Sequence, residues 1–177
     1  QVVTDYGSDK ESRAEWETAY EAALKVAKQV KEAKSFPWPG AANVKYPLVA
    51  VAAMQFAART LGEIIPPTGQ VVGGKVVGHD PQGAKKARAD RVADYMNDQL
   101  MEQMEGWQDD TDTLLHVLPV AGIAWRKTYW DGFGGQPCSE FYGPDVVVVN
   151  YWSRRSESPA RITHRITDWT RNDVLER

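Results

Sequence analysis

The spacing of the apolar residues changes partway along this 177-residue chain, and the change limits the folds that are open to it. Up to about residue 117, apolar side chains recur every three or four residues, which is the spacing of amphipathic helices. Over residues 123–166, short β-branched and aromatic runs alternate with turn residues, which is the pattern of strands. Helices in the N-terminal two-thirds, then an antiparallel β meander and a final helix from Arg171, predict the α+β class.

Capping residues and prolines divide the helical part. The expected helices span residues 8–34, 47–65, 80–106 and 108–117. In the first, Ser8 is the expected N-cap, with Glu11 three residues later. The second is enclosed by prolines and apolar on nearly every face, so we expect it to be the central, buried helix. The third is expected to bury an apolar stripe that ends at Met104, and Pro119 and Gly122 are expected to end the fourth.

The expected strands are short and lie late in the chain. They cover residues 123–130, 138–142, 146–149 and 161–166, with a hairpin loop over 131–137. The four consecutive valines at 146–149 predict a strand that is covered on both faces. Earlier, valine pairs on either side of two glycines predict a short hairpin or a bent strand over residues 70–77.

Composition is that of an ordinary folded domain and excludes several classes of protein. Hydrophobic residues make up 42% and charged residues 25%, which argues against disorder. The net charge of −3 gives no sign of a protein that coats nucleic acid. The single cysteine, Cys138, excludes an internal disulfide framework and a zinc site built from several thiolates. The longest apolar run, residues 48–58, falls well short of the roughly 20 residues that cross a bilayer.

Two further features concern the setting of the chain. It starts without methionine, and its last residues have the pattern of an unfinished helix, so we expect a part of a longer protein. It also contains seven tryptophans. Such large amphipathic rings predict either heavy interior packing or a large partner interface, and the sequence leaves both open.

Two short motifs are candidates for an enzymatic site. From Gly69 to Lys75 the chain matches G-x-x-x-x-G-K, a motif whose backbone N–H groups and lysine hold phosphates. Val76 stands where a magnesium-binding Ser or Thr belongs, which favours an ordinary glycine-rich turn. Asp109 and two nearby aspartates could bind magnesium, but a helix start favours the same residues, and we prefer that interpretation. The three histidines, His79, His116 and His164, have no metal-binding or catalytic spacing.

Basic residues gather in the first half of the third expected helix. They are Lys85, Lys86, Arg88 and Arg91. Such a cluster can contact phosphate groups, but in an acidic chain we prefer solvation or pairing with Asp90, Asp94 or a neighbouring subunit. The late-loop residues Arg154, Arg155 and Arg161 leave the same choice open.

Several short stretches, taken in order, resemble one known family. They are PWPGAANVKYP at 37–47, AAR at 57–59, RADRV at 88–92, MN at 96–97, DDTD at 109–112, LLH at 114–116, LPVAG at 118–122, RKTY at 126–129 and THR at 163–165. Together they resemble the portal proteins of tailed bacteriophages, in the branch of a short-tailed Salmonella phage, over about residues 36–166.

The resemblance implies a structural subunit of a ring, usually of about twelve copies, at one capsid vertex, through which double-stranded DNA is packaged and ejected. It implies capsid and scaffolding proteins as partners, and a terminase motor and tail adaptors that bind elsewhere on the subunit. It places the protein in the virion after assembly in the host cytoplasm. Residues 1–177 would be one piece of the peripheral wing region, helical over 8–117 and mostly β over 123–166. No catalytic, metal-binding or cofactor-binding residues are implied, so we expect no enzymatic activity.

On this hypothesis the candidate subunit-interface residues are Arg88, Arg91, Arg154 and Arg155. We expect Trp38 and Trp125 to pack within the subunit. The alternative function is an intracellular nucleotide-binding or metal-dependent hydrolase domain that uses the loop from Gly69 to Lys75 or the Asp109 cluster. A third hypothesis is an adaptor whose helices bind another protein.

Overall fold

The computed structural model covers the chain and describes all residues except 32–34, 43, 133, 154–160, 167–168 and 173–177. In this described part the elements are α1 (Val2–Ser12), α2 (Ala14–Ala27), α3 (Leu48–Ile64), α4 (Ala84–Asp98), the π-helical segment η1 (Gln99–Gln103), α5 (Trp107–Ala121), β1 (Trp125–Asp131), β2 (Gln136–Tyr142), β3 (Val147–Val149) and β4 (Ile162–His164). Helices precede strands, which confirms the α+β class.

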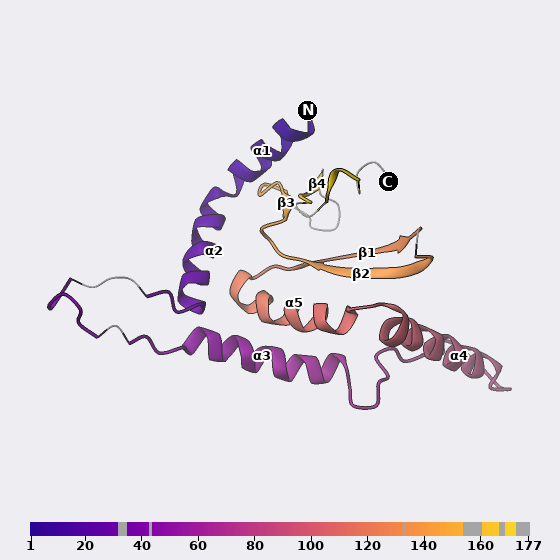
Figure 1. Ribbon diagram of the computed structural model, residues 1–177. Coiled ribbons are helices and arrows are strands. Elements are labelled where there is room, and N and C mark those ends of the chain that lie inside the picture. Colours follow the sequence, from indigo (N-terminus) through magenta and orange to yellow (C-terminus); the bar gives the residue numbers. More distant parts are fainter. Residues whose placement is uncertain (32–34, 43, 133, 154–160, 167–168, 173–177) are drawn as a thin grey trace.

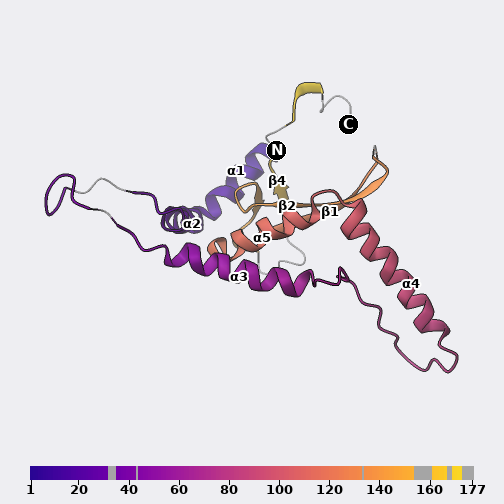
Figure 2. The same cartoon turned by 60° about the horizontal axis from the view of Figure 1, so that its bottom comes forward.

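Helix α5 lies at the centre of the molecule. It packs between α3 on one side and the β1–β2 hairpin on the other, and α2 also contacts it (Figure 1). The buried apolar residues of α3 and α5 are Ala53, Ala57, Trp107, Leu115 and Ala121. In contrast, α4 projects from this body, as the two ribbon views agree (Figure 2). The core is therefore small and is concentrated around α5.

The first helical region consists of two helices rather than the one that we expected over residues 8–34. Ser8 lies inside α1 and is not an N-cap, and the helix breaks at Arg13, where φ is −106° and ψ is 12°. Buried Arg13 donates a hydrogen bond of 2.8 Å from Nη1 to the carbonyl oxygen of Val147. α2 ends at Ala27, and Gln29 follows with a φ of 53°. The break thus coincides with a contact between Arg13 and a strand late in the chain. The residues near Arg13 in the sequence do not predict this contact.

Helix α3 has the expected boundaries but not the expected burial. It begins after Pro47 and ends before Pro66, as the prolines predict. Its buried residues are two alanines, whereas Leu48 and Met54 are 66% and 52% exposed. The alanines allow one face to approach α5 closely. The other apolar face has no covering element within the described residues, so the expectation of a fully buried helix is wrong.

Helix α4 also buries less than we expected. The carboxylate of Asp80 accepts a 2.9 Å hydrogen bond from the backbone N–H of Lys86 and so stabilises the first turn. Of the residues of α4, Ala93 is buried, whereas Val92 and Met96 of the predicted stripe are exposed. The reason is that α4 projects from the body, so its apolar stripe faces a single segment of chain.

Helix α5 continues past its expected end at residue 117. It includes Pro119 and ends at Gly122, whose φ of 75° is in the left-handed region that favours glycine. Proline removes one helical hydrogen bond and disturbs the preceding turn. The last turn nevertheless buries Ala121, and we attribute its persistence to this packing.

The strands form two separate antiparallel pairs instead of one continuous meander. β1 pairs with β2, with Trp125 opposite Tyr142, and β3 pairs with β4, with Val147 opposite His164. The first pair packs on α5, while β3 packs on α1. Val147 and Val148 are both buried, which confirms that the valine run is covered on both faces.

Two other expected elements differ from the structure or leave it. Residues 70–77 form no strand pairing and instead lie extended along α4. The expected final helix includes Arg171 and Asn172, and residues 173–177 lie outside the described part. No described helix is both long and apolar enough to span a membrane.

Candidate functional site

Residues 72–77 and α4 border an open hollow of about 420 Å³. Asn97 anchors the segment: its Nδ2 donates to the carbonyl oxygen of Val72 at 3.0 Å, and its Oδ1 accepts from the Val72 N–H at 2.8 Å. Gly74 lies so close to α4 that a Cβ there would be 2.8 Å from the carbonyl oxygen of Ala89. This glycine is therefore explained by the close approach of two backbones.

The same observation bears on the match to a phosphate-binding motif. The chain does not pass from a strand through residues 69–75 into a helix, because the segment is extended and α4 starts only at Ala84. The backbone N–H of Val72 is also already bonded to Asn97. The motif thus lacks the strand–loop–helix context in which such loops hold phosphate.

Cationic and apolar side chains share this hollow. Lys75 from the segment and Lys85 and Arg88 from α4 line it, together with the exposed Val92 and Met96. Lys85 Nζ donates to a backbone carbonyl, that of His79, at 3.2 Å. The hollow thus combines exposed apolar side chains with three cations.

The four cations of the α4 cluster are exposed, which agrees with solvation, one of the two interpretations that we preferred. Within the described residues, no ion pair involves Lys85, Lys86, Arg88 or Arg91. At about 100° per residue, Asp90 and Asp94 lie on the side of α4 away from Lys85 and Arg88. Arg88 and Arg91 are exposed, whereas the other two candidate interface residues, Arg154 and Arg155, lie outside the described part.

Acidic side chains gather where η1 meets α5. Glu102, Glu105 and Asp109 line a second open hollow, of about 440 Å³, whose apolar lining includes Met101 and Met104. These three carboxylates have no ion-pair partner among the described residues. The chain thus carries a second hollow, with a mostly polar lining, whose charge is opposite to that of the first.

The aspartates of the Asp109 cluster lie on α5 and stabilise this helix and its contacts. Asp109 and Asp110 lie in the first turn, where the helix dipole favours carboxylates. Asp110 Oδ2 also accepts a 2.8 Å hydrogen bond from the Phe141 N–H, which ties α5 to β2. Asp112 lies 3.5 Å from Nδ1 of His116. In the described part of the chain, no three His, Cys, Asp or Glu side chains come together to hold a metal ion.

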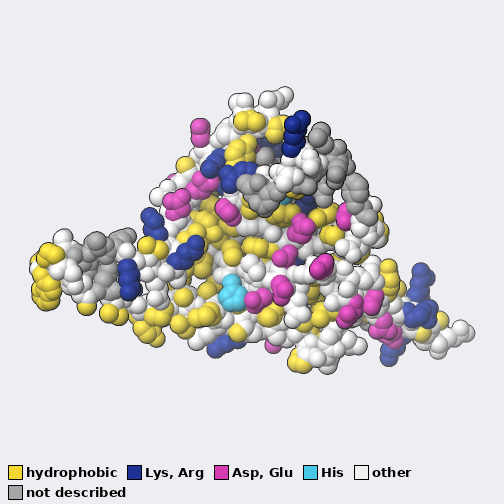
Figure 3. Space-filling model, viewed as in Figure 1, with side chains coloured by type: hydrophobic (Ala, Val, Ile, Leu, Met, Phe, Trp, Pro, Cys, Tyr) yellow, Lys and Arg dark blue, Asp and Glu magenta, His cyan; other side chains and the backbone are white. Residues whose placement is uncertain are grey.

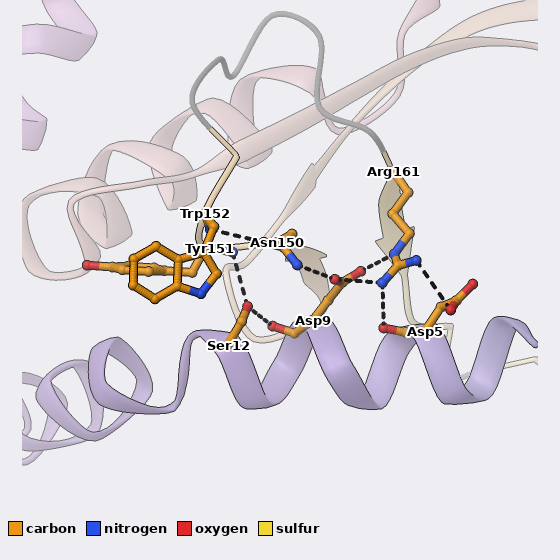
Figure 4. A network of polar contacts seen from close by, with 7 residues as sticks. All are labelled: Asp5, Asp9, Ser12, Asn150, Tyr151, Trp152 and Arg161. Atoms are coloured by element: carbon orange, nitrogen blue, oxygen red, sulfur yellow. Dashed lines mark hydrogen bonds and ion pairs between the residues drawn. The ribbon is translucent and has the colours of Figure 1, made fainter.

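A polar network joins the two ends of the chain (Figure 4). The carboxylate of Asp9, which is 0% exposed, accepts hydrogen bonds from Arg161 Nη2 at 2.9 Å and Asn150 Nδ2 at 2.8 Å, and one from Arg161 Nε. Arg161 Nη1 also lies 3.3 Å from Asp5. The hydrogen bonds from Arg161 hold the pKa of Asp9 below its ordinary value against the effect of burial, and that from Asn150 adds to this.

This network settles the role of Arg161, which pairs within the chain. Sequence analysis missed Asp9 because its partners are more than 140 positions away. One local signal could have found it: Asp9 and Arg13 continue, at helical spacing, the stripe that holds Trp16 and Tyr20. A charged residue in an apolar stripe needs a partner when it is buried.

A third hollow, of about 470 Å³, lies beside β2 and β4. The carboxylate of Glu140 accepts hydrogen bonds from the hydroxyl groups of Tyr129, at 2.7 Å, and of Tyr142. Burial and this carboxylate raise the pKa of Tyr142 well above its ordinary value. The His164 ring lies 4.0 Å from the Tyr142 ring, and burial together with Lys127 lowers its pKa. Tyr129 on β1 and Tyr142 on β2 thus share the carboxylate of Glu140. Together with the ring contact to His164 on β4, these bonds stabilise the contact of β2 with β1 and β4.

The tryptophans are divided between the interior and the surface. Trp107 is buried under Arg126, whose guanidinium lies 5.2 Å from the ring centre, and Trp125 is half-buried, as expected. Trp38, which we expected to pack within the subunit, is 64% exposed. It belongs to residues 36–42 and 44–46, called the arm below, which project from the body (Figures 1 and 2).

The chain exposes far more surface than a compact protein of its mass. Its accessible area is 13379 Å², whereas a folded monomer of 19.8 kDa is expected to expose about 8,600 Å². Hydrophobic side chains gather on the arm and along the α3 edge of the molecule (Figure 3). The large exposed residues there include Phe36, Trp38, Tyr46, Leu48 and Phe56. Apolar surface of this extent is typical of a protein that binds a partner.

No protein-family model, curated protein or solved structure matches the chain.

Proposed function

We propose that this chain is part of a subunit of the portal ring of a tailed bacteriophage. In this role it is a structural element at one capsid vertex, in a ring through which double-stranded DNA is packaged and ejected. The ring consists of copies of the subunit, is assembled in the host cytoplasm and is located in the virion. The chain itself has no catalytic role. The ordered series of stretches over about residues 36–166 supports the family assignment.

The observation that carries the proposal is the uncovered apolar surface. The total accessible area exceeds that of a compact monomer by about 4,800 Å², and exposed apolar side chains contribute to this excess. A standard protein–protein contact buries about 800 Å² on each partner, so the excess is enough for several contacts. A subunit in a cyclic ring has two neighbours and uses a different surface toward each. A chain with an extended arm and one uncovered helix face has the surfaces that this arrangement needs.

The arm provides a second, related argument. The longest stretch of resemblance, residues 37–47, lies mostly on the arm and includes the exposed Trp38 and Tyr46. Packing inside this chain does not account for aromatic residues at exposed positions, whereas an interface does. The sequence that most resembles the family therefore coincides with surface that is available to a partner.

The test is imaging of the protein expressed from its complete gene. We expect negative-stain electron microscopy and native mass spectrometry to show closed rings with an axial channel. Replacing Trp38 and Tyr46 together by serine should reduce the ring fraction strongly. The matched control replaces Tyr151 and Trp152, two exposed aromatic residues outside the arm, and should have a smaller effect. Monomers at micromolar concentration would refute the proposal, and ATP hydrolysis by such monomers would favour the hydrolase alternative.

A further inference from the structure

The two oppositely charged surfaces lie at opposite ends of one continuous helical rod, α4 followed by η1. The basic surface consists of Lys75, Lys85 and Arg88, which line one hollow, and the acidic surface consists of Glu102, Glu105 and Asp109, which line the other. At 1.5 Å per residue, about 21 Å of helix separates Arg88 from Glu102. This exceeds the Debye length of about 8–10 Å at ordinary ionic strength, so the two surfaces do not neutralise each other within one chain.

Resting on the proposed ring, we propose that the basic surface of one copy docks on the acidic surface of a second copy. Each surface lines an open hollow, of about 420 Å³ on the basic side and about 440 Å³ on the acidic side. Each hollow also includes apolar side chains: Val92 and Met96 in the basic one, and Met101 and Met104 in the acidic one. Docking would bury apolar groups on both sides and give unpaired charges of both signs a partner.

The position of the two surfaces favours a head-to-tail contact. The basic half of α4 projects from the body, while the acidic surface lies where the rod joins it (Figures 1 and 2). One copy can therefore reach its neighbour with the basic end while its own acidic end stays available to the next copy. Contacts between two different surfaces repeat around a ring, unlike the self-complementary contact of a two-fold dimer. The acidic surface on the same rod and the net charge of −3 make DNA the less suitable occupant.

Charge reversal tests this contact. Variant K85E/R88E reverses part of the basic surface, and variant E102K/E105K reverses part of the acidic one. By sedimentation velocity at low salt, we expect each to weaken self-association at least about tenfold. Combining all four substitutions restores opposite charges across the contact, so we expect the quadruple variant to return to within about threefold of the wild type. The control K25E/K28E reverses two exposed lysines at the C-terminal end of α2, the second just after the helix, and should have little effect.

The outcomes separate this inference from the portal proposal. Rescue by the quadruple variant supports the docking contact. It is overturned if the quadruple variant associates no better than either pair, if the α2 control weakens association equally, or if the only assembly is a closed dimer. It is also overturned if K85E/R88E abolishes binding to a labelled DNA duplex and leaves assembly unchanged. If rings form equally well with every charge reversal, the docking contact is wrong and the portal proposal is unaffected. Sedimentation of the 177-residue chain judges the contact even where no ring forms, and circular dichroism checks that each variant folds.

Discussion

Replacing Gly74 by alanine is expected to detach residues 72–77 from α4. A Cβ at this position would be 2.8 Å from the carbonyl oxygen of Ala89 and 3.0 Å from its Cβ. Ordinary contacts of this kind begin at 3.4 Å, so the segment must move by about 0.6 Å. Such a movement strains the two hydrogen bonds between Asn97 and Val72, which anchor the chain two residues earlier.

The size of the effect follows from these contacts. Overpacking of a close contact costs about 1–3 kcal/mol. Loss of a hydrogen bond costs about 1 kcal/mol, so breaking both bonds to Asn97 gives a cost in the same range. We therefore expect local opening of the segment to become easier by about 1–3 kcal/mol, which is about 5- to 150-fold faster exchange of the Val72 amide proton.

Hydrogen–deuterium exchange measures this opening directly. The matched control is Gly73→Ala, because a Cβ at Gly73 has nothing within 4 Å. That substitution should leave exchange at Val72 unchanged or slow it slightly, since alanine reduces the freedom of the unfolded chain. Asn97→Ala should reproduce the effect of Gly74→Ala by removing the anchor instead of adding a clash. Equal exchange rates in the two glycine variants would refute the close approach of the segment to α4.

Three other expectations concern stability. The pKa of Asp9 lies below its ordinary value of 3.8, so the contribution of Asp9 to stability is complete above pH 3.8 and is lost as the pH falls through the folded-state pKa. Asp9→Asn should therefore flatten the acid side of a plot of urea midpoint against pH, and an unchanged acid side would contradict this. Leu115→Ala should lower the free energy of unfolding by about 2–5 kcal/mol in urea denaturation, because Leu115 is buried on α5; a loss well below this would mean that the site is not packed as described. The fold favours the neutral form of Tyr142, whose pKa is raised, so this contribution to stability is complete below the ordinary pKa of 10.0 and is lost as the pH rises further. Tyr142→Phe should remove this loss of stability at alkaline pH, and an identical alkaline limb would argue against the bond to Glu140.

Short sequence patterns correctly predicted those features of the fold that depend only on neighbouring residues. Prolines placed both ends of α3, because a proline lacks the N–H that a helix interior needs and restricts the residue before it. The valine run predicted a covered strand, and Val147 and Val148 are buried in β3. Asp109 in the first turn of α5 follows from the helix dipole. Each of these inferences needs only a few neighbouring residues.

The geometry of the candidate site depends on contacts between residues that are far apart in the sequence, and local spacing does not predict such contacts. The basic cluster on α4 was visible in the sequence, but the segment that lies beside Lys85 and Arg88 and completes the hollow was not. The partner of Asp9 is Arg161, at the other end of the chain. The role of Gly74 became clear only when α4 was seen beside it.

The sequence by itself thus determined that helices precede strands, where most of these elements lie and which side chains favour burial, since steric limits and periodicity act over one or two turns. Only the tertiary structure decided what covers those side chains. It shows that α3 buries two alanines and exposes Leu48, and that the strands pair as two separate sheets. The physical reason is that amphipathic spacing records a tendency to bury a face without naming the surface that meets it. Only the packing of distant elements distinguishes a face that is buried within the chain from one that is left for a partner.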